Sequence, residues 1–77
     1  MPVKLLSELN CGEKGRIVKI GGIGSIRRRL LDMGLVSGSD IEMERVAPLG
    51  DPIEIKVKGY NLALRRQEAA TIQVEVA

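Results

Sequence analysis

The sequence predicts a mainly β fold: a small, half-open barrel of five or six short antiparallel strands with one short helix. Short segments in which apolar and polar residues alternate, as in strands buried on one face, recur along the chain. Nine glycines and three prolines fall mostly between these segments, where they end strands and form turns. Only one segment has apolar residues at helical spacing. In so short a chain, closing the sheet also protects its edges from unwanted pairing.

The first clear strand signal is residues 16–20, a short segment rich in β-branched residues. Residues 7–15 before it indicate a tight turn region, and the glycines of residues 21–24 end it. A strand, a glycine loop and a helix start also occur in phosphate-binding loops. Here no Gly-Lys-Ser or Gly-Lys-Thr closes the loop, and Arg27 stands where the dinucleotide pattern has its third glycine. We therefore interpret residues 19–25 as a structural turn.

The helix is expected at about residues 25–33. Gly24 or Ser25 can supply its N-cap, and Gly34 stands where a left-handed residue follows a helix end. Apolar residues at positions i, i+4 and i+7 form a narrow stripe for the core, namely Ile26, Leu30 and Met33. Leu31 lies on a neighbouring face and is expected at the edge of the core.

The second half of the chain is predicted to form mainly β structure. Further strands are expected at residues 41–46, 53–58, 62–65 and 72–76. The first of them shifts phase at Arg45, as a β-bulge would. Residues 47–52 form a long turn, because their two prolines cannot donate to a ladder. One helical turn is expected at residues 66–70.

Composition excludes several classes of protein. One cysteine cannot form an internal disulfide, and without histidine the chain has neither a tetrahedral zinc site nor a His-based catalytic triad. Twelve basic and ten acidic residues leave a net charge of +2, which is too mild for a nucleic-acid-binding arm. No apolar run approaches the ~18 residues of a membrane helix, and the first residues lack the apolar region of a signal peptide. We expect a cytoplasmic, single-domain protein over residues 1–77, without enzymatic activity, cofactor or direct membrane insertion.

Three motifs identify a family that this chain resembles. Residues 28–35, Arg-Arg-Leu-Leu-Asp-Met-Gly-Leu, precede residues 45–53, Arg-Val-Ala-Pro-Leu-Gly-Asp-Pro-Ile, and residues 62–66, Leu-Ala-Leu-Arg-Arg, follow. The chain resembles the ferrous iron transport protein A family (FeoA) over nearly its whole length. That resemblance implies an SH3-like barrel and a small cytosolic accessory of a membrane ferrous iron transporter that carries its own G-protein domain. The fold is also similar to the C-terminal domain of iron-dependent repressors.

The arginines of the helix allow two interpretations. They are either a solvated face, or a docking surface for an acidic patch of a partner in which Leu31 is the apolar anchor. Arginine suits the second role because its planar group pairs bidentately with carboxylates. Likewise, the proline-bracketed turn is either only rigid or presents Leu49 to a partner. The candidate partner-binding residues are Arg27, Arg28, Leu31, Leu49 and Arg65.

The remaining polar residues carry simpler expectations. Arg65 and Arg66 are expected to pair with Glu68 or Glu42 at the surface. Cys11 is expected to be buried or half-buried. The strand carboxylates face solvent by alternation, without a cleft to perturb them, and hard carboxylates alone would hold a ferrous ion only weakly.

Two other functions stay open. One is a stand-alone metal-responsive module similar to the repressor domain, which would bind ferrous ion through carboxylates. The other is an RNA-binding small barrel, which the mild charge and the single tyrosine disfavour. The sequence leaves weak self-association open as well.

Overall fold

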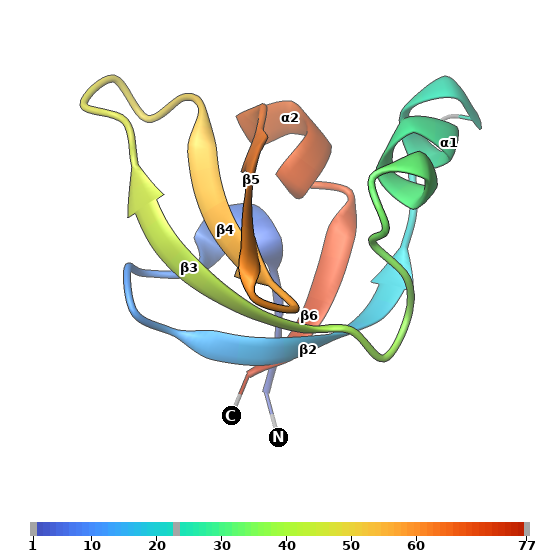
Figure 1. Cartoon of the computed structure of the whole chain (residues 1–77), viewed down its shortest axis with the longest axis horizontal. Coiled ribbons are helices and arrows are strands. Elements are labelled where there is room, and N and C mark those ends of the chain that lie inside the picture. The colour runs from blue at the N-terminus through green and yellow to red at the C-terminus, as the bar shows by residue number, and fades with distance from the viewer. Residues whose placement is uncertain (1, 23, 77) are drawn as a thin grey trace.

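The computed structural model describes residues 2–22 and 24–76, and six antiparallel strands form one continuous sheet (Figure 1). The strands are β1 (Val3–Leu5), β2 (Lys14–Ile20), β3 (Asp40–Val46), β4 (Ile53–Val57), β5 (Tyr60–Leu64) and β6 (Ile72–Val76). The helical elements are η1 (Leu6–Glu8), α1 (Gly24–Asp32) and α2 (Arg66–Ala69). The predicted mainly β fold is confirmed, with α2 as the predicted helical turn. None of the helices in the described ranges is long and apolar enough to cross a membrane.

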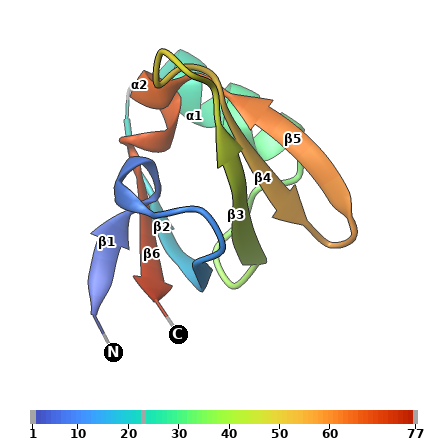
Figure 2. The ribbon, with the colours of Figure 1, turned by 90° about the vertical axis from the view of Figure 1, so that its left-hand side faces the viewer.

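The sheet curls into a barrel that stays half open. Its strand order is β1-β6-β2-β3-β4-β5, so β2 lies in the middle and pairs with both β6 and β3. Figure 2 shows β1, β6 and β2 on one side of the curl and β3, β4 and β5 on the other, with α1 and α2 at one end. Since β1 and β5 end the order without pairing to each other, the half-open form predicted from the sequence is confirmed.

The core is apolar and draws on strands β2 to β6. Strand β4 shows the clearest alternation, with Ile53, Ile55 and Val57 buried. Helix α1 adds Leu30, and η1 adds Leu6, both fully buried. Burying one such side chain contributes about 1.5–3 kcal/mol.

Strand β2 begins earlier than expected, because Gly15 is part of the strand and not of a turn. Gly15 lies opposite Ile41 on β3 and opposite Val76 on β6. A Cβ at this position would lie 2.7 Å from the Glu75 carbonyl oxygen and would also overlap the Val74 side chain. The glycine is therefore required by the close approach of β6.

Two β-bulges bend the sheet. The predicted phase shift at Arg45 is confirmed, since the register between β3 and β4 shifts between Met43 and Arg45. A second shift, between Ile17 and Lys19 in the pairing of β2 with β6, had no signal in the alternation. Bulges increase local twist, which helps a short sheet to curl.

Helix α1 spans Gly24–Asp32, so it starts and ends one residue earlier than the expected residues 25–33. Gly24 and Ser25 lie inside its first turn, so the predicted N-cap is wrong, and the residue before Gly24 lies outside the described residues. Gly34 has a φ of 91°, and the Leu35 N–H donates to the Leu30 carbonyl at 3.1 Å. This left-handed helix end confirms the predicted role of Gly34.

The loop before β2 contains Cys11, which is exposed, so the expectation that it is buried was wrong. The neighbouring Gly12 N–H donates to the Met43 carbonyl at 2.8 Å, so the loop is held to β3 through its backbone and not through the thiol. In the same loop, the Asn10 N–H donates to Glu13 at 2.6 Å. This hydrogen bond, assisted by the charge of Lys4, holds the pKa of the Glu13 carboxyl below its usual value, although desolvation acts in the opposite direction.

Candidate docking surface

Helix α1 packs against one end of the barrel through the predicted apolar stripe. Leu30 is fully buried, and Ile26 and Met33 are half-buried against the core. The Tyr60 hydroxyl on β5 donates to the Met33 carbonyl at 3.2 Å, which ties the end of α1 to the sheet. The helix therefore presents a fixed outer face.

The outer face carries three of the candidate residues. Arg27, Arg28 and Leu31 are all exposed, and Leu31 leaves 42% of its surface accessible. Leu31 is next to the buried Leu30 in sequence but about 100° away around the helix. Its predicted place at the edge of the core is confirmed.

The third arginine of the run, Arg29, behaves differently. Its Nε lies 3.3 Å from Glu68 Oε2, and Glu68 is only 3% exposed. The other carboxylate oxygen of Glu68 accepts the backbone N–H of Arg65 at 3.0 Å. Glu68 thus caps the start of α2 and joins it to α1.

The expectation that Arg65 and Arg66 form ion pairs with Glu68 or Glu42 was therefore wrong. The guanidinium that reaches Glu68 belongs to Arg29, from a distant part of the sequence, and Arg65 contributes only its backbone. Sequence reasoning missed the burial of Glu68. The usable signal was its position three residues after the residue that precedes α2, where an acidic side chain commonly returns to the backbone.

Two substitutions, Glu68→Gln and Glu68→Ala, test the interactions of Glu68 with Arg29 and Arg65. Glu68→Gln keeps an acceptor for the Arg65 N–H but removes the charge that faces Arg29, so we expect the free energy of unfolding to fall by about 1 kcal/mol. Glu68→Ala also leaves the N–H unpaired and should lower it by about 2 kcal/mol. Urea denaturation measures both, with the exposed Gln67→Ala as the matched control, expected within about 0.5 kcal/mol of wild type. Equal stability of the glutamine variant and wild type would contradict a stabilising role of the ion pair.

A groove of about 400 Å³ separates α1 from α2. It is lined by Ser25, Ile26, Arg29, Arg65, Gln67 and Glu68. The candidate Arg65 therefore lies beside α1, although it comes 38 positions after Arg27 in the chain.

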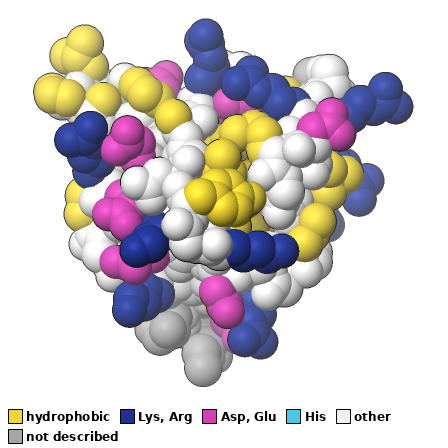
Figure 3. Space-filling model, in the orientation of Figure 1, with side chains coloured by type: hydrophobic (Ala, Val, Ile, Leu, Met, Phe, Trp, Pro, Cys, Tyr) yellow, Lys and Arg dark blue, Asp and Glu magenta, His cyan; other side chains and the backbone are white. Residues whose placement is uncertain are grey.

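The remaining candidate, Leu49, lies at the tip of the turn between β3 and β4 and is 96% exposed. Asp51 in this turn accepts the Arg66 N–H at 3.1 Å, so α2 lies between the turn and α1. Helix α1, the turn between β3 and β4 and the start of α2, which carry the five candidates, lie at the same end of the molecule (Figure 1). Figure 3 shows hydrophobic side chains over the turn at one side of this end, and several Lys or Arg side chains among acidic and other groups along the rest.

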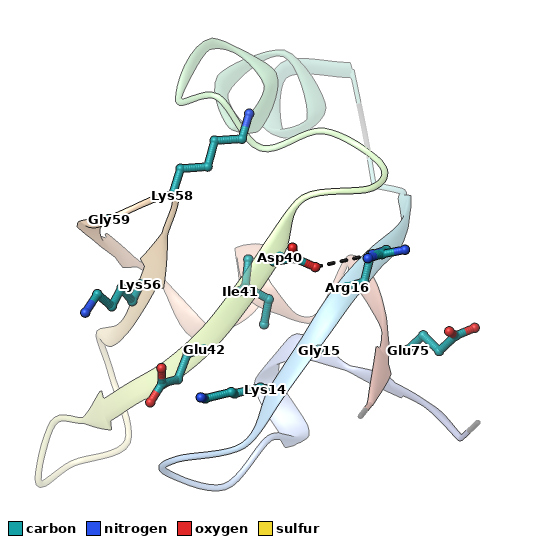
Figure 4. Close-up of a pocket in the computed structure, with 10 residues that line it drawn as sticks. All are labelled: Lys14, Gly15, Arg16, Asp40, Ile41, Glu42, Lys56, Lys58, Gly59 and Glu75. Carbon is teal, nitrogen blue, oxygen red and sulfur yellow. Dashed lines mark hydrogen bonds and ion pairs between the residues drawn. The ribbon is translucent and has the colours of Figure 1, made fainter.

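A second, shallow groove of about 490 Å³ lies on the outer face of the sheet (Figure 4). It is lined by Lys14, Gly15, Arg16, Asp40, Ile41, Glu42, Lys56, Lys58, Gly59 and Glu75. The expectation that the strand carboxylates have no cleft was wrong for Glu42, which lines this groove. The carboxylates do not converge, since Asp40 pairs with Arg16 at 3.3 Å and Glu42 and Glu75 point in different directions. In the parts of the chain that the structure describes, no three carboxylate or thiol groups are placed to hold a metal ion.

Known proteins are similar to this chain in both sequence and fold. The FeoA domain model matches residues 4–76. The Fe(2+) transport protein A/Fe(2+) transporter FeoB fusion protein of Porphyromonas gingivalis is 45% identical over 71 residues, which are 92% of this chain and 8% of that protein. The FeoA-like protein of Clostridium acetobutylicum has a TM-score of 0.90 at 39% identity, covering 99% of this chain and 88% of that one.

Two further solved structures bear on the fold. The FeoA of Stenotrophomonas maltophilia, solved with zinc and described as a procaryotic SH3 domain protein, is 30% identical with a TM-score of 0.79. The match covers 91% of this chain and 87% of that one, and it confirms the SH3-like class. The T. acidophilum IdeR is 26% identical with a TM-score of 0.87, covering 100% of this chain and 35% of that one. The expected similarity to iron-dependent repressors is therefore confirmed.

Proposed function

Because this chain belongs to the FeoA family, we propose that it is a non-enzymatic accessory protein of ferrous iron uptake, which binds and modulates the cytosolic part of a membrane ferrous iron transporter. It acts as one domain in the cytoplasm and reaches the inner face of the membrane through its partner. Contact with the G-protein domain of that transporter biases its nucleotide cycle or its gate.

The observation that carries this proposal is the fusion protein of Porphyromonas gingivalis. A segment 45% identical to this chain shares a polypeptide there with the transporter FeoB. Covalent linkage keeps two parts at a high effective concentration, which favours even a weak direct contact between them. A separate chain must achieve the same contact through its own surface.

The exposed face of α1 is the surface that supports such a contact best. Arg27 and Arg28 form no ion pair within residues 2–22 and 24–76, so both are available to carboxylates of a partner. Leu31 adds an apolar contact beside them, and a residue of this kind surrounded by polar groups is a common source of binding energy. Arg65 and Leu49 extend this surface along the same end of the molecule.

Binding of the soluble cytosolic region of the transporter, with and without guanine nucleotide, tests the proposal. We expect Leu31→Glu, and separately the double change of Arg27 and Arg28 to glutamate, to weaken binding at least about tenfold. Val3→Glu is the matched control, because Val3 is 53% exposed on β1, at the far end from α1, and should bind like wild type. Circular dichroism verifies that all variants are folded.

The outcomes separate the surface from the function. Variants of α1 that bind like wild type would show that this face is not the contact. Failure of the wild-type protein to bind the transporter region in either nucleotide state would contradict the proposed function itself.

A second candidate function is a metal-responsive module, which the likeness to the iron-dependent repressor IdeR supports. It requires ferrous or manganous ion to bind this chain at micromolar concentration. Calorimetry with each ion measures this directly, and binding with loss of transporter contact would favour the module over the accessory protein.

A further inference from the structure

Strand β5 is an edge strand, hydrogen-bonded only to β4. The two strands are joined by Lys58 and Gly59, which have φ angles of 50° and 87°, as in a two-residue hairpin turn. In such a hairpin the pair that closes the turn, Val57 and Tyr60, is hydrogen-bonded and the pattern then alternates. The N–H and C=O groups of Asn61 and Ala63 therefore point away from β4, and no other residue in the described ranges accepts or donates to them.

Several of the usual protections of an edge strand are absent from β5. Natural edge strands are guarded by prolines, charged residues, bulges or very short length. The five residues of β5, Tyr60–Leu64, include no charged residue and no proline, and their register with β4 is uninterrupted. The other edge, β1, has only three residues. Figure 2 shows β5 as the outermost strand of its side of the curl.

An apolar strip runs along β5 toward α1. Tyr60 is 42% exposed and Leu62 is half-buried on the inward face of β5, while Ile26 of α1 and Met33, which follows α1, are also half-buried. Figure 3 shows a hydrophobic patch in the middle of this face, along β5. A strand added to β5 would place alternate side chains over this strip, as expected for recognition by strand addition.

The charges at the two ends of β5 indicate what kind of strand fits. Lys58 precedes it and Arg65 follows it, and neither forms an ion pair with any described residue. A second copy of this chain is a poor occupant. An antiparallel pair of β5 edges would bring Lys58 of one copy toward Arg65 of the other, and like charges facing across strands are destabilising.

We propose that the β5 edge is a docking site for an extended segment of a partner protein with an apolar centre and acidic ends. The segment adds a strand through the outward groups of Asn61 and Ala63, covers the apolar strip, and pairs its acidic ends with Lys58 and Arg65. This inference rests on the proposed function only in requiring a protein partner.

The first test uses a synthetic nine-residue peptide with two glutamates at each end and alternating valine and threonine between them. NMR titration of the full chain should shift the amides of β5, and hydrogen exchange at Asn61 and Ala63 should slow at least about tenfold at saturation. A matched peptide with lysines in place of the glutamates should bind at least about tenfold more weakly.

The second test removes the donor at the edge. The Ala63 N–H points outward, so Ala63→Pro deletes the group used in docking without deleting a bond between β4 and β5. We expect Ala63→Pro to abolish the peptide-induced shifts, and Ala63→Thr, which keeps the N–H, to retain them. Lys58→Asp reverses one charge with a residue suited to this turn and should weaken binding about fivefold. Unchanged core amide shifts verify that each variant is folded.

Three results obtained without the transporter would overturn the proposal. They are no shift in β5 at millimolar peptide, equal binding by the Ala63→Pro variant, and exchange at Asn61 and Ala63 that slows with protein concentration alone, which would assign the edge to a second copy. A transporter region that binds Ala63→Pro as tightly as wild type also overturns docking at β5 and leaves the proposed function intact. A transporter region that binds neither protein, while the peptide still binds, overturns the proposed function and supports the edge site.

Discussion

Replacing Leu30 by alanine is expected to lower the free energy of unfolding by about 2–5 kcal/mol, whereas the same change at Leu31 should alter it by less than about 0.5 kcal/mol. Leu30 is fully buried where α1 meets the barrel, so its truncation leaves a cavity that neighbouring strands cannot fill. Leu31 already exposes 42% of its surface and leaves no cavity. A domain of this size has about 4–12 kcal/mol of stability in total, so the first variant comes close to unfolding.

Urea denaturation followed by circular dichroism measures both leucine variants under identical conditions. The dependence of the free energy of unfolding on urea concentration should be the same for both variants, because neither change greatly alters the surface area that unfolding exposes. Comparable losses at the two positions would show that α1 is rotated about its axis and that Leu31 is not available to a partner.

Replacing Gly15 by alanine is expected to lower the free energy of unfolding by about 2–3 kcal/mol. The added Cβ would meet the Glu75 carbonyl oxygen at 2.7 Å, and this atom belongs to the backbone of β6, which cannot turn away as a side chain would. Strand β2 is paired on both sides here, with Ile41 and Val76 opposite Gly15. A shift of β2 away from β6 would therefore disturb the pairing of β2 with β3.

Gly24→Ala is the matched control for Gly15→Ala. Gly24 lies in α1 with no atom within 4 Å of an added Cβ, and alanine favours the helix, so stability should rise by up to about 0.5–1 kcal/mol. Thermal denaturation should move the two midpoints in opposite directions. A Gly15→Ala variant as stable as wild type would mean that β2 and β6 are farther apart than the structure has them.

The candidate docking residues show which features could be predicted from the sequence and which could not. Leu31 could be placed at the edge of the core, because its angle to the apolar stripe follows from helix geometry alone. The neighbouring arginines could not be told apart, since only the position of α2 decides that Arg29 reaches Glu68. The proximity of Arg65 to α1 could not be predicted either, because it depends on the path of the chain after β5.

Features that depend on neighbouring residues could be predicted from the amino-acid order: the alternation of β4, the apolar stripe of α1, the glycine that ends the helix and the bulge in β3. These follow from backbone preferences and from the periodicity of one element, which act over a few residues. The tertiary structure alone decided that Gly15 lies inside a strand, that Cys11 is exposed, that Glu68 is buried beside Arg29 and that β5 is left with an open edge. Each of these depends on which distant segments meet when the sheet closes, and that outcome is set by the packing of the whole core.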